Sequence, residues 1–225
     1  MAKTVAVMQP YFFPYAGYFS LMRVVDHFVL FDCVQFPRRG WVHRNCAPGP
    51  AGQERWLTLP LARQPRDTLI CDLTFAENAD ASLAKRLRAF GWPSQATGDA
   101  GRSLGRQLSG PLSTPVAFLA SSLRTCAALL GIETQVSLSS DLALGADLRG
   151  QDRVIAAAKA VGGSHYVNSA GGRALYAAEA FESQGLELSF MQPYQGSRWS
   201  ILYRLCTDGP DVVASEIATN GDVSH

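Results

Sequence analysis

Short apolar runs and amphipathic segments alternate along this chain of 225 residues. The β-branched run from Thr4 to Met8 predicts a strand, which ends at Gln9-Pro10 because proline cannot continue the pairing of a central strand. Apolar residues at helical spacing from Gly17 to Val25 predict a helix, and the run from Phe28 to Phe31 predicts a second buried strand. The chain therefore opens with a β-α-β unit, in which a ligand normally binds beyond the carboxyl ends of the strands.

The same alternation continues through the rest of the chain. Thr114-Pro115 is a favourable helix start and Gly131 a favourable helix stop, so one long helix is expected between them. Residues 94–113 are rich in Gly, Ser, Gln and Arg without a sustained period, and they predict a long mobile loop. Further strands are expected over 54–59, 69–73, 134–138, 164–168 and 186–190, and further helices over 80–90, 152–161 and 173–184. The pattern predicts one α/β domain over residues 1–225, layered, with a mostly parallel sheet and flanking helices.

Composition and charge narrow the classes of function. Hydrophobic residues make up 47% of the chain and charged residues 17%, which is typical of a globular protein with a large core. Twenty basic and nineteen acidic residues give a net charge of +1, so no overall field attracts nucleic acid or an anionic membrane. We find neither a signal peptide nor an apolar run approaching the roughly 20 residues of a membrane helix. The five cysteines lack metal or redox spacing, so we expect free thiols in the cytoplasm and no metal site.

An aromatic loop follows the first predicted strand. Residues 9–18 contain two prolines and five aromatic side chains, so this loop should be stiff and suited to a pocket wall. Its candidate substrate-binding residues are Gln9, Tyr11, Tyr15 and Tyr18, which combine apolar bodies with polar tips. The alternative is that these rings plug the end of the sheet as ordinary core residues.

A second group of candidates follows the second predicted strand. Asp32 is a candidate for orienting an amine or accepting its proton, and Cys33 for forming a covalent intermediate. Arginine forks suit carboxylate or phosphate, and an indole offers a flat face to a ring, so residues 35–45 predict an anion-binding loop. Its candidates are Gln35, Arg38, Arg39, Trp41, His43 as a general base, Arg44 and Asn45. The alternatives are that Asp32 caps a turn and that the loop is a solvated surface segment.

Polar residues also follow two strands expected in the second half. Ser139 and Ser140 follow one of them, and Asn168 with Gly171-Gly172 follows the other. At such strand-to-helix turns free backbone amides bind phosphate or carboxylate, and glycines let a ligand approach closely; a plain tight turn is the alternative. The chain contains no Walker loop, nucleophile elbow, zinc-protease helix or dinucleotide fingerprint. The reaction class that remains is group transfer, in which the protein positions two small-molecule substrates.

Strings of residues spread over nearly the whole chain are together distinctive. They are Met8 to Tyr15, Gly17 to Phe19, Phe31-Asp32, Val34 to Phe36, Gly40-Trp41, Arg44-Asn45, Leu130 to Ile132, Ser139-Ser140, Asp152-Arg153, Tyr166 to Asn168, Gly171-Gly172, Tyr176 and Ser200-Ile201. On these residues the chain resembles the WbqC-like family, found among genes for polysaccharide and O-antigen biosynthesis. The resemblance implies a glycine transferase that adds an aminoacyl group to an amino sugar.

The chain departs from the family pattern at three positions. Cys33 stands where the family often has a second acid, Tyr203 stands where an acid commonly follows the Ser-Ile pair, and Ala47 replaces a bulky aliphatic residue. If a missing acid held a metal or a proton in other members, this chain has altered that step. The departures therefore raise the prospect of a changed substrate.

Two classes of function fit these residues. The leading hypothesis is a biosynthetic transferase that attaches a small acyl or aminoacyl group to an amine, from a donor activated beforehand or with ATP and Mg²⁺. In support of nucleotide activation, Tyr15-Ala16-Gly17-Tyr18 resembles the His-x-Gly-His turn of the Rossmann-like nucleotidylyltransferases, which include pantothenate synthetase, with tyrosines in place of the histidines. The alternative is a non-catalytic module that binds a sugar or nucleotide for a partner enzyme. Either function requires residues 9–18 and 41–45 to meet around one cleft at a rim of the sheet.

Overall fold

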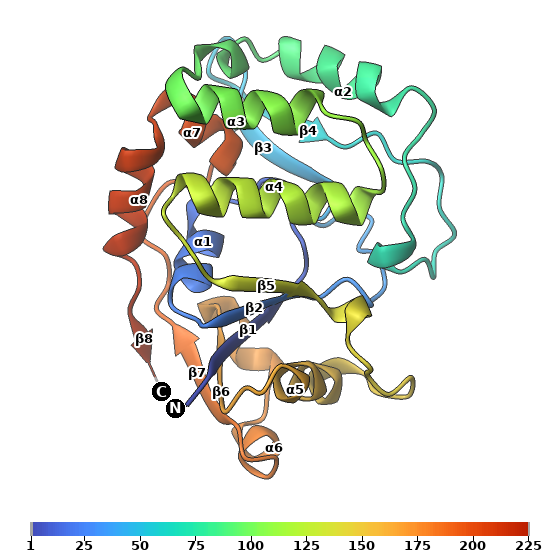
Figure 1. Ribbon diagram of the computed structural model, residues 1–225, viewed down its shortest axis with the longest axis vertical. Coiled ribbons are helices and arrows are strands. Elements are labelled where there is room, and N and C mark those ends of the chain that lie inside the picture. Colours follow the sequence, from blue (N-terminus) through green and yellow to red (C-terminus); the bar gives the residue numbers. More distant parts are fainter. Residues whose placement is uncertain (1, 225) are drawn as a thin grey trace.

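A six-stranded sheet forms the centre of the computed structural model, which describes residues 2–224 (Figure 1). The strand order is β5-β2-β1-β6-β7-β8, and every pairing is parallel except that of β8 with β7. The strands are β1 (Thr4–Met8), β2 (His27–Leu30), β5 (Gln135–Leu138), β6 (His165–Asn168), β7 (Glu187–Met191) and β8 (Val223–Ser224). The predicted α/β class with a mostly parallel, Rossmann-like layered sheet is confirmed.

Helices cover both faces of this sheet (Figure 1). Val5 and Val7 of β1 point to the face covered by α5 (Gly150–Ala160) and α6 (Ala178–Glu182), whereas Ala6 points to the opposite face. That opposite face is covered by α1 (Ala16–Arg23) and α4 (Pro115–Leu129). The strict alternation along β1 thus divides the apolar core into two clusters, as the pleat of a strand requires.

A further layer packs outside α4. Residues 31–134 connect the neighbouring strands β2 and β5, and they supply most of this layer. Its elements are the hairpin β3 (Arg44–Pro48) and β4 (Glu54–Thr58), α2 (Ala79–Arg88) and α3 (Gly98–Ser109), joined by α7 (Ile201–Thr207). Helix α8 (Pro210–Ala218) packs against α1 and α7. Short 3-10 helices lie at η1 (Ile70–Asp72), η2 (Trp92–Gln95), η3 (Ser139–Asp141) and η4 (Ala170–Leu175).

The prediction of a long mobile loop over residues 94–113 is wrong, because the structure contains helix α3 there. Ala100, Leu104 and Leu108 recur every four residues, and α3 packs with this stripe against α4 and α7. The glycines between them obscured the pattern. Tertiary packing overrides the weak helix propensity of this segment.

Two other predicted elements are also different. In place of the strand predicted over 69–73 the structure has an isolated antiparallel bridge between Leu69 and Gln35, followed by η1 at Ile70–Asp72. The helix predicted over 173–184 is confined to α6, because residues 170–175 form η4 and Tyr176 is extended, with its ring packed against Tyr166. Strands β3 and β8 and helices α7 and α8 were not predicted.

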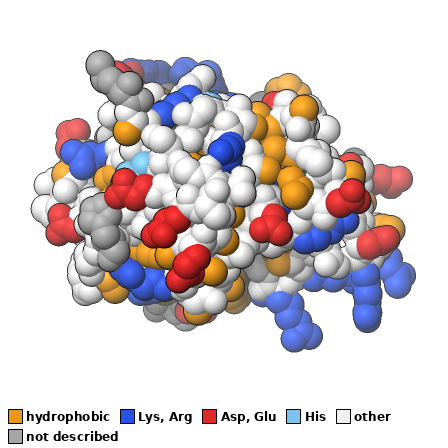
Figure 2. Space-filling view, turned by 90° about the horizontal axis from the view of Figure 1, so that it is seen from below, with side chains coloured by type: hydrophobic (Ala, Val, Ile, Leu, Met, Phe, Trp, Pro, Cys, Tyr) orange, Lys and Arg blue, Asp and Glu red, His pale blue; other side chains and the backbone are white. Residues whose placement is uncertain are grey.

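The surface carries no dominant charge on the side shown in Figure 2, where acidic and basic side chains are interspersed. This distribution agrees with the net charge of +1. Within residues 2–224 none of the helices combines the length and the apolar character needed to cross a bilayer.

Substitutions in α3 test whether this segment is a packed helix. Leu104 is 2% exposed, so we expect Leu104→Ala to lower the free energy of unfolding by about 2 to 4 kcal/mol. Gly105 is exposed on the same helix, and a Cβ added there meets no atom within 4 Å. Gly105→Ala should therefore raise the free energy of unfolding by about 0.5 to 1 kcal/mol through helix propensity. Urea denaturation measures both effects, and a loop at this position would show neither.

Candidate functional site

The carboxyl ends of the five parallel strands lie along one edge of the sheet. From β1 the chain moves through β2 to β5 on one side and then returns to β6 and β7 on the other side. Between β1 and β6 the connections therefore diverge, and in open α/β sheets such a switch point is where ligands bind. Gln9, Asp32, Ser139 and Asn168 all lie at or directly after the ends of these strands.

A buried carboxylate joins the turns after β2 and β5. Asp32 is 0% exposed, and its Oδ1 accepts hydrogen bonds from Ser139 Oγ and Ser140 N, both at 2.8 Å. Its Oδ2 accepts from Ser140 Oγ at 2.6 Å. Ser139 Oγ in turn accepts from the backbone N–H groups of Asp32 and Cys33, at 3.0 and 3.2 Å. Asp32 thus positions the two serines, and only Ser140, which is exposed, connects it to the surface.

Two polar side chains lie next to the half-buried thiol of Cys33. Arg153 Nε donates to Cys33 Sγ at 3.2 Å, and Ser139 Oγ lies 3.0 Å from the same sulfur. Because the lone pairs of Ser139 Oγ already accept two N–H groups, its proton goes either to Asp32 or to Cys33. The Arg153 guanidinium is thus the cation next to this sulfur. We call Asp32, Cys33, Ser139, Ser140 and Arg153 the thiol cluster.

The other four cysteines are in environments that suppress ionisation. Burial is the main cause in each case, and it raises the pKa of the Cys71 thiol to about 11 and those of Cys46 and Cys206 to about 12. Burial also raises the pKa of Cys126 strongly. These thiols therefore stay protonated at neutral pH.

A cavity of about 300 Å³ opens at the same edge of the sheet, beyond β6 and β7. The rings of Tyr15 and Tyr194 meet edge to face there, with centroids 5.4 Å apart, and the Arg198 guanidinium lies 5.9 Å from the Tyr15 ring. A Cβ on Gly17 would lie 2.3 Å from the Tyr15 ring, so the close approach requires glycine. We call this cavity the tyrosine pocket; its lining residues are Tyr15, Gly17, Ser20, Ser169, Ala170, Gly171, Met191, Gln192, Pro193, Tyr194, Arg198 and Asn220.

Tyr194 is held in this pocket by an ion-pair network. Its hydroxyl donates to Glu216 Oε1, while Glu216 Oε2 accepts from Nη2 of the buried Arg204 at 2.8 Å. The hydrogen bond from Arg204 is the main cause that lowers the pKa of Glu216, and burial raises the pKa of Tyr194. Tyr194 is therefore an uncharged hydrogen-bonding group at neutral pH.

Two of the predicted substrate-binding residues, Tyr18 and Asn168, are buried and form hydrogen bonds within the edge of the sheet. Tyr18 is buried, its hydroxyl donates to the Gln9 carbonyl at 2.9 Å, and its ring contacts the half-buried Tyr11 at 5.6 Å. Asn168 is also buried; its Nδ2 donates to Tyr166 Oη at 3.0 Å, and its Oδ1 accepts from Ser169 N at 2.6 Å. The alternative interpretation of the aromatic loop, that its rings are ordinary core residues, applies to Tyr18.

Residues 9–18 and 41–45 do meet, through backbone groups and the side chain of Asn45. Phe12 N donates to the Trp41 carbonyl at 2.9 Å, and Asn45 Nδ2 donates to the carbonyls of Phe12 and Phe13 at 3.2 and 2.6 Å. Asn45 is 4% exposed and fastens the loop. None of Gln35, Trp41, His43, Arg44 and Asn45 lines the tyrosine pocket, so the candidates divide between the sheet edge and the hairpin.

His43 is poorly placed to act as a general base. Its ring packs edge to face against Phe36 at 5.1 Å, and burial together with the charge of Arg44 lowers its pKa to about 4. It is neutral at pH 7, but it lies in the outer layer and away from the thiol cluster, with which it makes no hydrogen bond.

The sequence alone did not reveal the importance of Arg153, Tyr194, Arg198 and Glu216. Asp152-Arg153 at a helix start is compatible with a local cap and ion pair, but the position of Arg153 in the first turn of α5 directs it to the strand ends. Tyr194 follows a predicted strand, and this position was a usable signal. Arg198 and Glu216 belong to segments without any recognised pattern.

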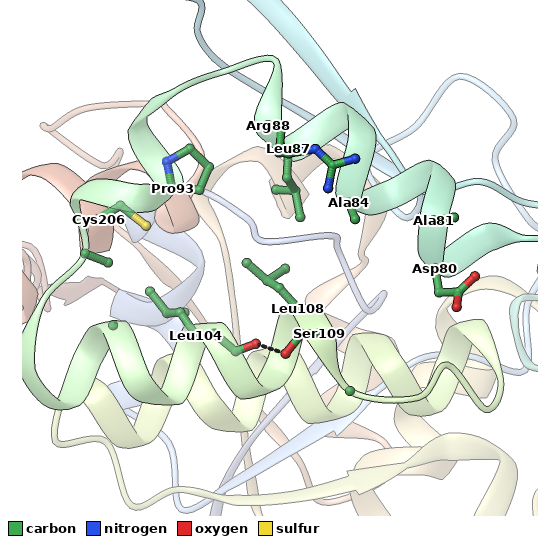
Figure 3. Close-up of a pocket in the computed structure, with 14 residues that line it drawn as sticks. Asp80, Ala81, Ala84, Leu87, Arg88, Pro93, Leu104, Leu108, Ser109 and Cys206 are labelled. Carbon is green, nitrogen blue, oxygen red and sulfur yellow. Dashed lines mark hydrogen bonds between the residues drawn. The ribbon is translucent and has the colours of Figure 1, made fainter.

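A further cavity, of about 470 Å³, lies between α2 and α3 (Figure 3). Leu87 of α2 and Leu104 and Leu108 of α3 point into it, with Asp80 and Arg88 beside them. Its walls are mainly aliphatic and glycine residues, and they present no nucleophile paired with a base. This cavity is therefore a poor candidate for group transfer.

Comparison with known proteins assigns the family. The WbqC-like protein family model matches residues 9–203, and the chain belongs to that family. The chain is also similar to "Uncharacterized protein Rv1507c" of Mycobacterium tuberculosis (strain ATCC 25618 / H37Rv), with 35% identity over 74 residues. This match covers 30% of the present chain and 32% of that relative's length. No solved structure matches the chain.

Thiol reactivity tests the geometry of the thiol cluster. With iodoacetamide at pH 8 we expect Cys33 to be alkylated first, because the four other thiols have raised pKa values. Arg153→Gln should slow alkylation of Cys33 by about tenfold, since a hydrogen bond to a charged group contributes about 1.5 to 3 kcal/mol. Peptide mass spectrometry over time measures both rates. Faster labelling of the half-buried Cys71 would contradict the assignment.

The stability of the protein should fall at acid pH partly through His43. Its pKa is about 4 in the fold against an ordinary value of 6.5, so the unfolded chain binds the proton more tightly. This contribution is complete above about pH 6.5 and is lost as the pH falls toward about 4. We expect His43→Gln to reduce the acid-induced loss by about 1 to 2 kcal/mol, allowing for partial exposure of the ring. Urea denaturation at neutral and acid pH measures it, and an unchanged loss would contradict it.

Proposed function

We propose that this member of the WbqC-like family is a biosynthetic transferase that attaches a small acyl or aminoacyl group, such as glycyl, to an amine. Membership in the family suggests a biosynthetic role. The observation that carries the specific proposal is the half-buried Cys33 sulfur, with Arg153 Nε 3.2 Å and Ser139 Oγ 3.0 Å away, at the carboxyl edge of a parallel sheet. This combination supports nucleophilic catalysis at a position where ligands usually bind.

In the first step the Cys33 thiolate attacks the carbonyl carbon of an activated donor, a thioester or an ester. A new C–S bond forms, and the bond to the donor's thiol or alcohol breaks, so that this group leaves with a proton from solvent. Arg153 and Ser139 hold the thiolate before the attack. The donor arrives already activated in this scheme; activation with ATP and Mg²⁺ by the protein itself is the competing route, and omission of ATP from the assay separates the two.

In the second step a neutral amine attacks the acyl group on Cys33. The C–N bond forms, the C–S bond breaks, and the thiolate returns to its position next to Arg153. The exposed Ser140 offers a path for the amine's proton, because its hydroxyl donates to Asp32 Oδ2 at 2.6 Å. Ser140 Oγ accepts the proton while it passes its own to Asp32. Asp32 is thus reached through a serine and does not itself touch the substrate.

The tyrosine pocket is suited to hold the acceptor. The rings of Tyr15 and Tyr194 can pack against a sugar ring, and Arg198 can pair with an anionic group. Strand β1 separates β2 from β6, so the ends of β2 and β6, which lead to Cys33 and to the pocket residue Ser169, are about 10 Å apart at the usual strand spacing. An elongated acceptor is needed to reach from the pocket to Cys33.

Trapping of the acylated protein tests this proposal. Incubation with a glycyl thioester should add the mass of one glycyl group to Cys33, and an amino-sugar acceptor should then remove it. Cys33→Ser should not form the thioester, whereas Cys71→Ser, a change at the neighbouring half-buried thiol, should form it at the wild-type rate. Intact-protein and peptide mass spectrometry measure the adduct.

Two results would contradict the transferase. Full turnover by Cys33→Ser would remove the covalent step. Ligand-induced thermal stabilisation without product from any donor, with or without ATP, would instead support the alternative of a non-catalytic sugar- or nucleotide-binding module.

A further inference from the structure

Two indole side chains, Trp56 on β4 and Trp41 in the loop just before β3, lie side by side and are open to water. Trp41 is 45% exposed and Trp56 is 43% exposed, and their ring centroids are 5.3 Å apart with the planes tilted by 33°. No other aromatic side chain in residues 2–224 is similarly exposed. The Arg44 guanidinium lies 4.3 Å from the centroid of the Trp56 ring, which adds a cation to this surface. Flat faces of this kind stack against nucleobases or sugar rings.

Exposed arginines surround two adjacent pockets next to these rings. Arg38, Arg63 and Arg86 line a pocket of about 370 Å³, and Arg38 and Arg66 line a second one of about 460 Å³. Phe36 and Arg38 line both pockets, so the two form one groove, which we call the arginine groove. Its other lining residues are Gln35, Pro37, His43, Thr58, Leu59, Pro60, Leu61, Ala62 and Gln64, and none is acidic.

The charges in this groove are not neutralised within the described part of the chain. The ion pairs found in residues 2–224 involve Arg102 and Arg204 only, so none of the four groove arginines has a carboxylate within 4.0 Å. Clustered guanidinium groups without counter-charges repel one another, and a bound anion relieves that repulsion. The groove is therefore an anion-binding surface by its charge.

Backbone carbonyls hold two of these guanidinium groups in place. Arg38 Nη2 donates to the Gln64 carbonyl and Arg86 Nη1 donates to the Thr58 carbonyl, both at 2.6 Å. Each guanidinium carries five N–H groups, so most of its donors stay available to a ligand. Anchoring of the side chains before binding reduces the entropy that a ligand would otherwise have to overcome.

The strand register places the rings and the groove next to each other. Arg44 of β3 is the direct partner of Thr58 of β4, and Thr58 lines the groove. Trp56 precedes Thr58 by two residues and projects from the same face of β4, about 7 Å along the strand. A single small molecule can therefore contact the indoles at one end and the arginines at the other.

We propose that the outer face of the β3–β4 hairpin binds a nucleotide, a ligand that joins phosphates to a ring, with the ring on Trp41 and Trp56 and the phosphates in the arginine groove. This site belongs to the outer layer and not to the sheet edge that carries Cys33, so the proposal is independent of the acyl transfer proposed above. The overall charge of +1 favours a small phosphorylated ligand over a long nucleic acid, which needs an extended basic surface.

Isothermal titration calorimetry at low salt with ADP, pyrophosphate and glucose 1-phosphate tests the proposal. We expect ADP to bind, pyrophosphate to bind more weakly because it lacks a ring, and added salt to weaken both. Stronger binding of glucose 1-phosphate than of ADP would assign the ring site to a sugar in place of a base.

Two pairs of variants assign the contacts. Arg86→Gln should weaken ADP binding by about tenfold, as expected for the loss of a charge-assisted hydrogen bond, whereas Arg88→Gln on the same helix should leave it unchanged because Arg88 is outside the groove. Trp56→Ala should weaken ADP about fivefold or more and leave pyrophosphate unchanged, since stacking contributes about 1 to 3 kcal/mol per base. Trp56→Phe keeps an aromatic ring and should retain most of the affinity.

Three results would overturn the proposal. They are the absence of binding by all three probes, equal losses in Arg86→Gln and Arg88→Gln, and tighter binding of a single-stranded oligonucleotide than of ADP. Circular dichroism verifies that each variant is folded. Acylation of Cys33 in Arg86→Gln should proceed as in the wild type, so failure of the nucleotide site and failure of the transferase are distinguishable.

Discussion

The carbonyl group of one residue, Phe13, joins three segments of the chain next to the first strand. Phe13 adopts a left-handed backbone conformation with φ of 42°, which costs a residue with a side chain about 1 to 3 kcal/mol. It is retained because its ring is fully buried and its carbonyl accepts hydrogen bonds from Asn45 Nδ2 at 2.6 Å and Ser200 Oγ at 2.8 Å. Three segments far apart in the chain, the loop after β1, the hairpin and the start of α7, are thus fixed on a single atom.

The tyrosine pocket and the site on the β3–β4 hairpin both depend on this arrangement. The turn at Phe13 directs the chain into α1, and it thereby sets Tyr15 against Tyr194 in the tyrosine pocket. On the other side Asn45 anchors β3, so its inward neighbours Ala47 and Leu57 pack in the core while Arg44 and Trp56 face outward. Burial of Asn45 costs little because its amide is fully engaged, whereas its loss would leave polar groups unpaired in the core.

The elements that could be predicted from the sequence are those that a local pattern of residues determines. The β-branched apolar run from Thr4 to Met8 was enough to predict β1, and the bracket of Thr114-Pro115 and Gly131 was enough to predict α4, because strand propensity and helix caps are local properties. Helix α3 and strand β3 were beyond such reasoning, since each forms through packing against distant segments. For the same reason Asp32 and Ser139 could be nominated one by one as residues at strand ends, whereas the convergence of Arg153 on Cys33 requires the fold.

The side chains around position 33 indicate how a cysteine there would differ chemically from the acid that is common in the family. The resemblance to the WbqC-like family implies that an acid is common where this chain has Cys33. An acid there would face Arg153 and form a stable ion pair, with the anion held but unreactive toward an acyl group. A thiol receives the same guanidinium and the hydroxyl of Ser139, but its ionised form is a strong nucleophile. In the proposed mechanism a cysteine at this position therefore carries a covalent intermediate, whereas an acid would only anchor the guanidinium.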